Sequence, residues 1–463
     1  MNYKTPGVYV EEIAKFPPSV AQVETAIPAF IGYTEKGPKN EPTRISSMLE
    51  YEMLFGKAKN EGGAIKISIK DTVVTPTFDN AKLGTFKMYY AMQMYFANGG
   101  GPCYIVSVGS AVGYPTGVNA VDFNELKDGL ATLEKEDEPT LIVFPDAEGL
   151  TLEDDAYELY GLALDHAGLM KDRFVIMDVV GNDEVSAVSD FRLKLDSSEN
   201  LKYGAAYYPK LETILSYGFK DEDVEITSYE VTNDSGVLVP VAPAVADLAE
   251  LKSKSSELYN QAKAAIESKK VIMAPSSTMA GVYAKVDSTS GVFKAPANLG
   301  LNYVVAPTVK ISHEDQEILN VDATSGKSIN AIRTFTGKGT LVWGARTLDG
   351  NSNEWRYISV RRFFNMVEES VKKATERFVF EPNTANTWVR VQTMIENFLN
   401  QQWQDGALAG SKPEEAYYVS VGLNKTMSAQ DILEGRMVIE VGMAAVRPAE
   451  FIVLRFSHKL QEA

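Results

Sequence analysis

Short apolar runs alternate with longer amphipathic stretches through the middle of the chain, from about residue 140 to residue 274. A strand that helices cover on both faces reads as a short continuous apolar run, and the helix connecting it to the next parallel strand reads as an amphipathic stretch. The alternation therefore predicts an α/β layer with mostly parallel strands. The predicted strands are residues 141–144, 174–179, 205–208 and 271–274, and the predicted helices are residues 152–170, 185–195 and 247–268.

Two segments do not follow this pattern. Residues 57–80 are polar and contain glycine, with a brief alternation at Ile65, Ile67 and Ile69, which predicts a hairpin inserted outside the core. Residues 221–243 mix acidic residues with Thr, Val and Pro, which predicts a β-type excursion at the surface.

After about residue 350 the pattern changes to two amphipathic helices, each with one apolar stripe that we interpret as core. The first stripe comprises Val360, Phe363, Phe364, Val367, Val371, Ala374 and Phe378, and the second comprises Trp388, Val391, Ile395, Phe398 and Leu399. Residues 436–446 and 450–460 then read as strands.

Both ends of the chain read as short strands. The apolar residues that define them are Val8, Tyr9, Val10 and Ile13 near the N-terminus and Ile452, Leu454 and Phe456 near the C-terminus. A strand at the end of a chain can close a sheet edge within its own subunit. It can also pair with the exposed edge of a neighbouring copy, which satisfies backbone hydrogen bonds in both molecules. The residues themselves leave both alternatives open.

Composition restricts the partners and the compartment. The formal net charge is -17, so the summed field of the protein repels nucleic acids and anionic membrane surfaces. No apolar run approaches the roughly 18 residues of a membrane span, and residues 1–12 lack the apolar core of a signal peptide. Cys103 is the only cysteine, which excludes an internal disulfide and fits a reducing cytoplasm. We expect a protein that is soluble before assembly.

No arrangement of residues indicates catalysis, a metal or a cofactor. The histidines, His166, His313 and His458, stand far apart and near no nucleophile. Residues 325–328 (SGKS) imitate the end of a phosphate-binding loop, but Val321 stands where the first glycine should be. The three glycines at residues 99–101 lead into a strand and not into a helix N-terminus. We therefore expect no enzyme, and no catalytic, cofactor-binding or metal-ligating residue.

A series of blocks, in their order and spacing, resembles phage tail sheath proteins and the sheaths of related extracellular contractile injection systems. The blocks are residues 5–13 (TPGVYVEEI), 29–38 (AFIGYTEKGP), 98–106 (NGGGPCYIV), 281–284 (GVYA), 291–298 (GVFKAPAN), 337–348 (GKGTLVWGARTL), 355–364 (WRYISVRRFF), 406–408 (GAL) and 446–456 (VRPAEFIVLRF). The resemblance covers most of the chain. Residues 57–80 and 221–243 match no pattern of the family.

The resemblance implies a combined α/β and α+β fold in three parts. An N-terminal arm, residues 1–30, joins a discontinuous C-terminal assembly domain, residues 350–463. An outer α/β domain, residues 31–349, stands outward and carries the insertions near residues 57–80 and 221–243. The two terminal strands named above are exchanged between subunits.

The function implied by the resemblance is mechanical. Subunits stack as helical rings around an inner tube, and contraction between two packings of the same interfaces drives the tube through a target envelope without a nucleotide. The implied partners are further copies of the chain, the inner tube protein, baseplate proteins and tail-terminator or cap proteins, with no nucleic acid and no direct membrane insertion. The subunit is made in the bacterial cytoplasm and joins a phage tail or an extracellular injection particle. Another self-assembling lattice or shell protein and an α/β hydrolase are the alternatives.

The charge is distributed unevenly. Residues 355–463 contain 13 basic and 13 acidic side chains, so residues 1–354 carry the whole -17. Off the apolar stripe of the first C-terminal helix lie four basic side chains, Arg361, Arg362, Lys372 and Lys373. We expect this polar face to contact an acidic inner tube in a salt-sensitive manner. A solvated helix face with internal Glu–Lys pairs is the alternative.

Overall fold

The computed structural model describes residues 19–109, 113–115, 121–150, 152–181, 185–195, 199–242 and 244–454. The chain divides into two compact units. The larger unit contains the described residues 24–365 and 447–454, and the smaller unit contains the described residues 19–23 and 366–446. The boundary at residues 365 and 366 falls inside helix α10 (Ile358–Thr375).

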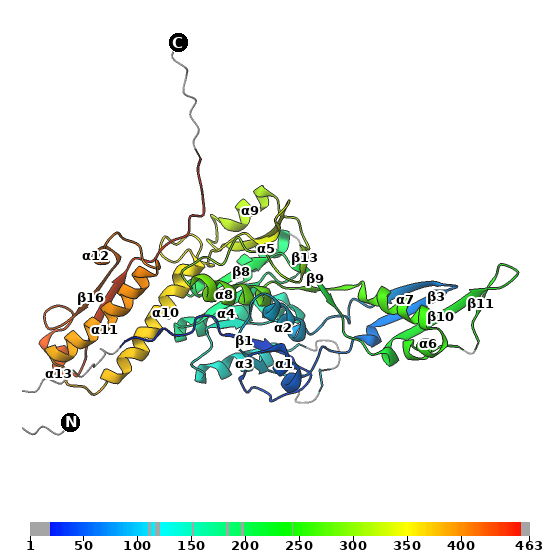
Figure 1. Ribbon diagram of the computed structural model, residues 1–463, viewed down its shortest axis with the longest axis horizontal. Helices are drawn as coiled ribbons and strands as arrows, with labels where there is room; N and C mark the ends of the chain where they lie inside the picture. The colour runs from blue at the N-terminus through cyan, green and yellow to red at the C-terminus, as the bar shows by residue number, and fades with distance from the viewer. Residues whose placement is uncertain are drawn as a thin grey trace, which may run out of the picture. The chain divides into compact units, whose positions relative to one another are not determined.

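An eight-stranded sheet forms the centre of the larger unit (Figure 1). In spatial order its strands are β15 (Gly339–Val342), β14 (Ile329–Phe335), β8 (Gly204–Tyr208), β7 (Phe174–Asp178), β6 (Leu141–Val143), β1 (Pro28–Gly32), β5 (Cys103–Ser107) and β2 (Thr43–Ile45). The strands from β14 to β5 run parallel, and the edge strands β15 and β2 run antiparallel to their neighbours. The predicted mixed α/β fold is confirmed.

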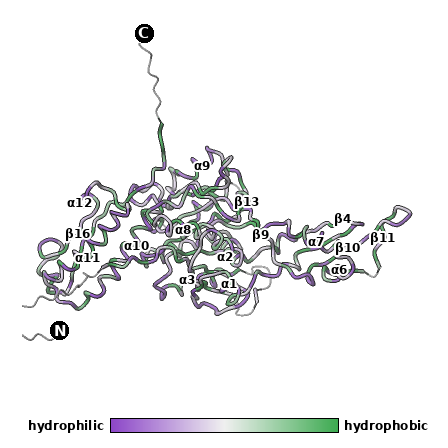
Figure 2. The backbone as a smooth tube through the Cα atoms, viewed as in Figure 1, coloured by the Kyte–Doolittle hydropathy of each residue, from purple (hydrophilic) through white to green (hydrophobic). Residues whose placement is uncertain are grey.

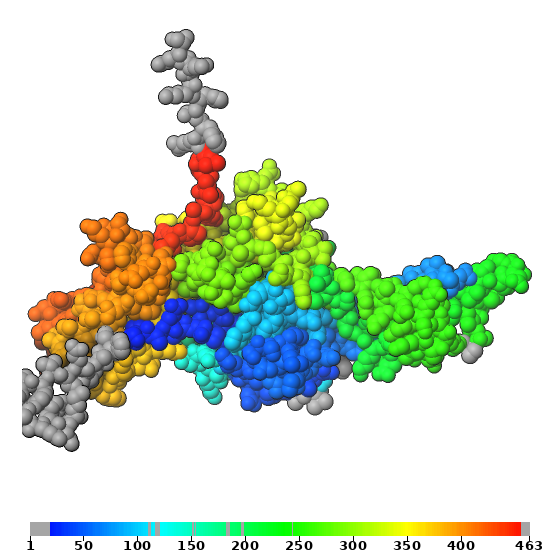
Figure 3. Space-filling view, in the orientation of Figure 1, coloured from blue at the N-terminus to red at the C-terminus, as the bar shows by residue number. Residues whose placement is uncertain are grey.

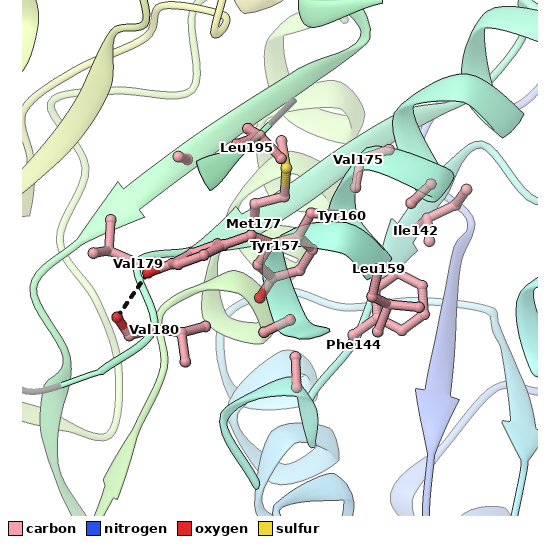
Figure 4. Packing of buried hydrophobic residues seen from close by; sticks show 14 of the residues in the cluster. Ile142, Phe144, Tyr157, Leu159, Tyr160, Val175, Met177, Val179, Val180 and Leu195 are labelled. Atoms are coloured by element: carbon pink, nitrogen blue, oxygen red, sulfur yellow. Dashed lines mark hydrogen bonds between the residues drawn. The ribbon is translucent and has the colours of Figure 1, made fainter. Parts of the chain in front are cut away.

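Successive residues of the central strands enter two different cores, which explains their continuous apolar runs. Ile142, Val175 and Met177 pack on one face, whereas Leu141 and Phe174 pack on the other. The first core is closed by α3 (Phe123–Thr132), α4 (Glu153–Met170) and α5 (Val185–Lys194), and the second by α1 (Met48–Phe55), α2 (Met88–Ala97) and α8 (Ser276–Ser290). Figure 4 shows the first core, where the Tyr157 hydroxyl on α4 donates to the Val180 carbonyl at 2.9 Å.

Most elements predicted for the α/β layer are present, but one strand lies elsewhere. Residues 270–273 form β12 (Lys270–Met273), which belongs to a separate three-stranded antiparallel sheet with β9 (Leu211–Ser216) and β13 (Val304–Pro307). The apolar run alone could not reveal its partner, because strand pairing is decided by tertiary structure.

The two unmatched insertions pair with each other. The predicted hairpin is β3 (Ile65–Lys70) and β4 (Val73–Phe78), and the predicted excursion supplies β10 (Glu225–Thr232) and β11 (Leu238–Pro240). Strand β10 runs parallel to β3, so the four strands form one sheet, β11-β10-β3-β4. We call this sheet and helices α6 (Leu248–Lys254) and α7 (Ser256–Glu267) the satellite (Figure 1).

The predicted hairpin is present, but the expectation that it is not a core element is wrong, because the satellite has a core of its own. Ile65, Ile67 and Ile69 are fully buried and pack against Leu248 and Tyr259. The predicted single helix over residues 247–268 is also wrong, because Ser255 is extended and its hydroxyl caps α7 by accepting from the Leu258 amide. The break allows both short helices to turn apolar residues toward the same sheet.

The smaller unit contains α11 (Ala385–Gln404), α12 (Pro413–Ala416), α13 (Ala429–Leu433) and a two-stranded antiparallel sheet of β16 (Tyr417–Val421) and β17 (Ile439–Met443). Helix α9 (His313–Asn320) lies in the larger unit. Short 3-10 turns occur at Gly62–Ala64, Leu133–Lys135, Ala147–Gly149, Leu201–Tyr203, Asp221–Asp223 and Glu376–Phe378. Of the helices that the structure describes, none combines the length and the apolar character needed to cross a membrane.

Candidate assembly surfaces

The C-terminal arm, residues 447–454, is extended and makes no strand pairing within the described residues (Figure 3). Its four consecutive apolar side chains, Phe451 to Leu454, are exposed by 71–80%, and the arm is green there in Figure 2, before the grey trace begins. The predicted strand over residues 450–460 is therefore not formed over residues 450–454. A strand needs a partner, and one subunit supplies none there. Phe456, like Val8, Tyr9, Val10 and Ile13, lies outside the described residues.

The root of the C-terminal arm is held by a single carboxylate. Glu450 receives a bidentate contact from Arg346, with Nε to Oε1 at 2.9 Å and Nη2 to Oε2 at 2.7 Å. The Asn320 amide donates to Oε1 at 2.8 Å and the Tyr357 hydroxyl to Oε2 at 3.1 Å. Burial by itself would raise the pKa of Glu450, but these hydrogen bonds outweigh it and hold the pKa below its usual value.

The chain enters the larger unit at its N-terminal end through a second polar cluster. Arg362 donates to both carboxylate oxygens of Asp287 and, at 2.9 Å, to the Thr25 carbonyl. The Thr25 hydroxyl donates to the same carboxylate at 2.6 Å. The Thr140 hydroxyl donates to the Thr25 carbonyl at 2.9 Å. Sequence reasoning missed both clusters, because their partners are distant in the sequence; the only cue was Glu450, a lone acid beside an apolar run.

The sheet of the smaller unit has open edges. Among the described residues, the strands β16 and β17 pair only with each other, with a further bridge from Leu408 to Ala445 beyond β17. A two-stranded ribbon is marginal alone, and here Val419 and Val421 are buried while α11 packs beside β16. Unpaired edges of this kind accept strands from other molecules.

The comparisons with known proteins agree with this architecture. Residues 351–459 match the family model described as the phage tail sheath C-terminal domain. Over its length the chain is similar to the anti-feeding prophage helical sheath in its contracted state, with 33% identity, a TM-score of 0.66, and coverage of 99% of this chain and 100% of that one.

The chain belongs to the family of contractile sheath proteins. The predicted resemblance is confirmed. The sheath of an extracellular contractile injection system, PVC, in its contracted state is 29% identical with a TM-score of 0.66, covering 99% of both chains.

Two phage sheath proteins are more distant relatives. The tail sheath protein of Enterobacteria phage T4 is 25% identical over 121 residues, which are 26% of this chain and 18% of that protein. The tail sheath protein of Vibrio phage KVP40 is 24% identical over 179 residues, which are 38% of this chain and 25% of that protein. The matched region thus spans a quarter or less of these phage proteins.

Two of the four basic residues expected to face an inner tube lie inside the sheath protein. Arg361 is only 2% exposed, with its guanidinium 4.2 Å from the centre of the Trp355 ring, and Arg362 is 4% exposed and paired with Asp287. The expectation that these arginines lie on a solvent-facing surface is wrong. Charged residues beside an apolar stripe can be buried where aromatic rings and carboxylates contact them.

The other two basic residues keep their side chains partly in solvent. Lys372 Nζ lies 3.0 Å from one carboxylate oxygen of Glu369, and Lys373 Nζ lies 3.5 Å from the other. These spacings of three and four residues are the internal pairs of the alternative interpretation. The Glu369 side chain is only 8% exposed, so both lysines reach from solvent to a buried carboxylate.

Two carboxylates are buried at or just beyond the carboxyl ends of the parallel strands, where α/β enzymes hold ligands. Asp146 follows β6 and accepts the backbone amides of Tyr33 at 2.7 Å and Lys87 at 2.5 Å. Asp178 ends β7 and accepts the backbone amide of Ser276 at 2.7 Å. Burial raises the pKa of Asp146 to about 6 and that of Asp178 to about 7. Both carboxylates join backbone segments of the fold.

The other groups considered for chemistry also have structural contacts. Lys327, in the loop that imitates a phosphate-binding motif, donates to the carbonyls of Arg192 and Leu195. His166 accepts from Arg173 at 2.8 Å, and burial together with that guanidinium lowers its pKa to about 4. The Cys103 side chain is fully buried, and burial raises the pKa of its thiol.

Proposed function

We propose that this protein is the structural subunit of a contractile sheath, which polymerises as helical rings around an inner tube and contracts to drive that tube through a target envelope. The observation that carries the proposal is the full-length similarity to a helical sheath in its contracted state, at 33% identity. The protein acts mechanically and not as an enzyme. The buried carboxylates, Lys327 and His166 support this, because each is engaged by the fold itself.

The linkage between copies is strand exchange. The C-terminal arm supports it, since the arm exposes consecutive apolar side chains that the subunit leaves uncovered. The β16–β17 sheet supports strand exchange as the acceptor, since its edges can pair with a strand from another copy. In this arrangement the N-terminal strand at Val8, Tyr9, Val10 and Ile13 and the C-terminal strand at Ile452, Leu454 and Phe456 are both given to neighbouring copies.

Different parts of the chain have different roles in the sheath. Residues 350–463 with the arm at residues 1–30 form the assembly domain, and residues 31–349 form the outer domain that carries the satellite. Lys372 and Lys373 contact the inner tube. They are the two of the four basic residues that remain on the surface, because Arg361 and Arg362 are buried.

The further partners are a baseplate and a terminator or cap protein. One baseplate structure of the anti-feeding prophage contains a chain 34% identical to this one, covering 99% of this chain and 100% of that one. The subunit is made in the bacterial cytoplasm and becomes part of a phage tail or an extracellular injection particle.

Electron microscopy of the purified protein tests the proposal. Helically striated hollow tubes are expected. Flat or closed lattices would identify a shell protein instead, and discrete particles would favour a hydrolase or another enzyme. Strand exchange is tested separately by deleting residues 1–13, and stable tubes from this truncated protein would refute it.

A further inference from the structure

Two buried arginines stand where the two terminal arms leave the larger unit. Arg346 holds Glu450, the last residue before the exposed apolar run, and Arg362 holds Thr25, three residues before the central strand β1. Each guanidinium contacts both oxygens of one carboxylate, the geometry that resists rotation as well as separation. The side chains of both arginines are almost fully buried, at 4% and 3% exposure.

The first arginine is connected to the central sheet by a continuous chain of hydrogen bonds. The backbone amide of Arg346 donates to the Asn330 side chain at 2.8 Å, and that side chain donates back to the Arg346 carbonyl at 2.8 Å. Asn330 lies on β14 and also donates to the Ala206 carbonyl on β8 at 3.2 Å. Glu450 is thus two contacts away from β14 and three contacts away from β8, its parallel neighbour.

The second arginine is connected to the sheet more directly. The Thr25 carbonyl, held by Arg362, also accepts from the Thr140 hydroxyl, and that hydroxyl accepts the Ile27 amide at 3.0 Å. Thr140 immediately precedes β6, and Ile27 immediately precedes β1. Strands β1 and β6 are neighbours at the middle of the sheet.

We infer that Arg346 and Arg362 are positioning residues that fix the roots of the two terminal arms and pass the pull on an arm to the central sheet. The inference rests on the proposed function, because only arms that link copies are pulled when the sheath moves. A fixed root also reduces the entropy that an arm loses on joining a neighbour. The entropy lost on fixing the backbone of one residue lowers an association constant by about tenfold or more, so a residue that is already fixed spares the arm this loss.

The test uses Glu450→Gln in the full-length protein, with a nitroxide on Ala449→Cys. Cys103 is buried, so only the introduced cysteine reacts. We expect the label to become more mobile in the unassembled subunit and the critical concentration for tube formation to rise about tenfold. Glu434→Gln is the matched control, because it removes a carboxylate from an arginine pair at the surface, with Arg436. It should change neither quantity.

Two further variants keep the test decisive. Tyr357→Phe removes one hydrogen bond from Glu450 and should change both quantities in the same direction but by less. This variant replaces Glu450→Gln in the test if Glu450→Gln fails to fold. Asp287→Asn with a label on Glu24→Cys tests the second root in the same way, because it alters the carboxylate that Arg362 contacts through both oxygens. Unchanged label mobility, or increased mobility with an unchanged critical concentration, would overturn the inference.

Truncation after Glu450 separates this inference from the proposed function. If the truncated protein forms tubes as readily as the intact one, the C-terminal arm does not link copies and the proposed strand exchange fails. If truncation abolishes tubes while Glu450→Gln leaves assembly unchanged, the arm links copies and only the anchoring role is wrong.

Discussion

Replacing Ile452 and Leu454 together by Asp is expected to prevent tube formation without weakening the folded subunit. The two side chains are 80% and 72% exposed, so they contribute little to the core of their own molecule. In an assembled sheath, the proposed exchange would cover them with a neighbouring copy.

The size of the effect follows from that change in exposure. Fully burying one Ile or Leu side chain contributes about 1.5–3 kcal/mol, and the two positions together contribute about 3–6 kcal/mol. Since about 1.4 kcal/mol corresponds to a factor of ten, losing both should raise the critical concentration by about 100-fold or more. Burying a carboxylate in their place adds to the loss.

The critical concentration is measured by light scattering and sedimentation, and subunit stability by thermal melting. Leu169→Asp with Leu193→Asp is the matched control, since these leucines are 71% and 82% exposed but lie on α4 and α5. Both double variants should melt close to the unmodified subunit, because exposed substitutions shift stability by about 0.5 kcal/mol or less. Equal critical concentrations for the arm variant and the unmodified protein would refute the reasoning, as would an equal loss in the control.

Three other predictions concern the satellite, the buried carboxylates and the inner tube. Ile67→Ala should lower the free energy of unfolding of the satellite by about 2–5 kcal/mol. Hydrogen exchange should become faster in the satellite strands and stay unchanged in β6 to β8. Faster exchange over the central sheet as well would contradict a separate core. Because burial raises the folded-state pKa of Asp178 to about 7, the stability that its protonated form contributes is lost as the pH rises through that value. Asp178→Asn should therefore raise the free energy of unfolding more at pH values above about 8 than at pH values below about 5. Between these values the gain should grow by up to about 1.4 kcal/mol per pH unit. An equal gain at high and low pH would contradict the raised pKa of Asp178. Lys372→Glu with Lys373→Glu should weaken co-assembly with the tube protein and flatten its dependence on salt, whereas an unchanged salt dependence would assign these lysines to a solvated face.

The α/β layer could be predicted because its information is local. Residues 141–144 are apolar throughout, and residues 174–179 are apolar except for Asp178, because both of their faces are covered. The helix over residues 152–170 shows its apolar side at the helical period. The strand at β12 has the same local pattern, yet it joins a different sheet. An apolar run reports burial and does not report the partner.

The candidate site was predicted less completely. Alternation at the end of the chain predicted a strand at Ile452 and Leu454, but only the structure showed that these side chains are exposed, and their exchange with another copy stays a prediction. Arg361 and Arg362 were assigned to a polar surface because the helical period placed them off the apolar stripe. Their burial depends on Trp355 and Asp287, and the helical pattern carries no information about either partner.

The sequence by itself determined the class of fold and the family, since these depend on periodicity and on ordered blocks along the chain. Only the tertiary structure decided that residues 65–70 pair with residues 225–232 and that Glu450 reaches Arg346. Contacts between residues about a hundred or more positions apart are selected by the packing of the whole domain, and their local sequences are compatible with many other partners.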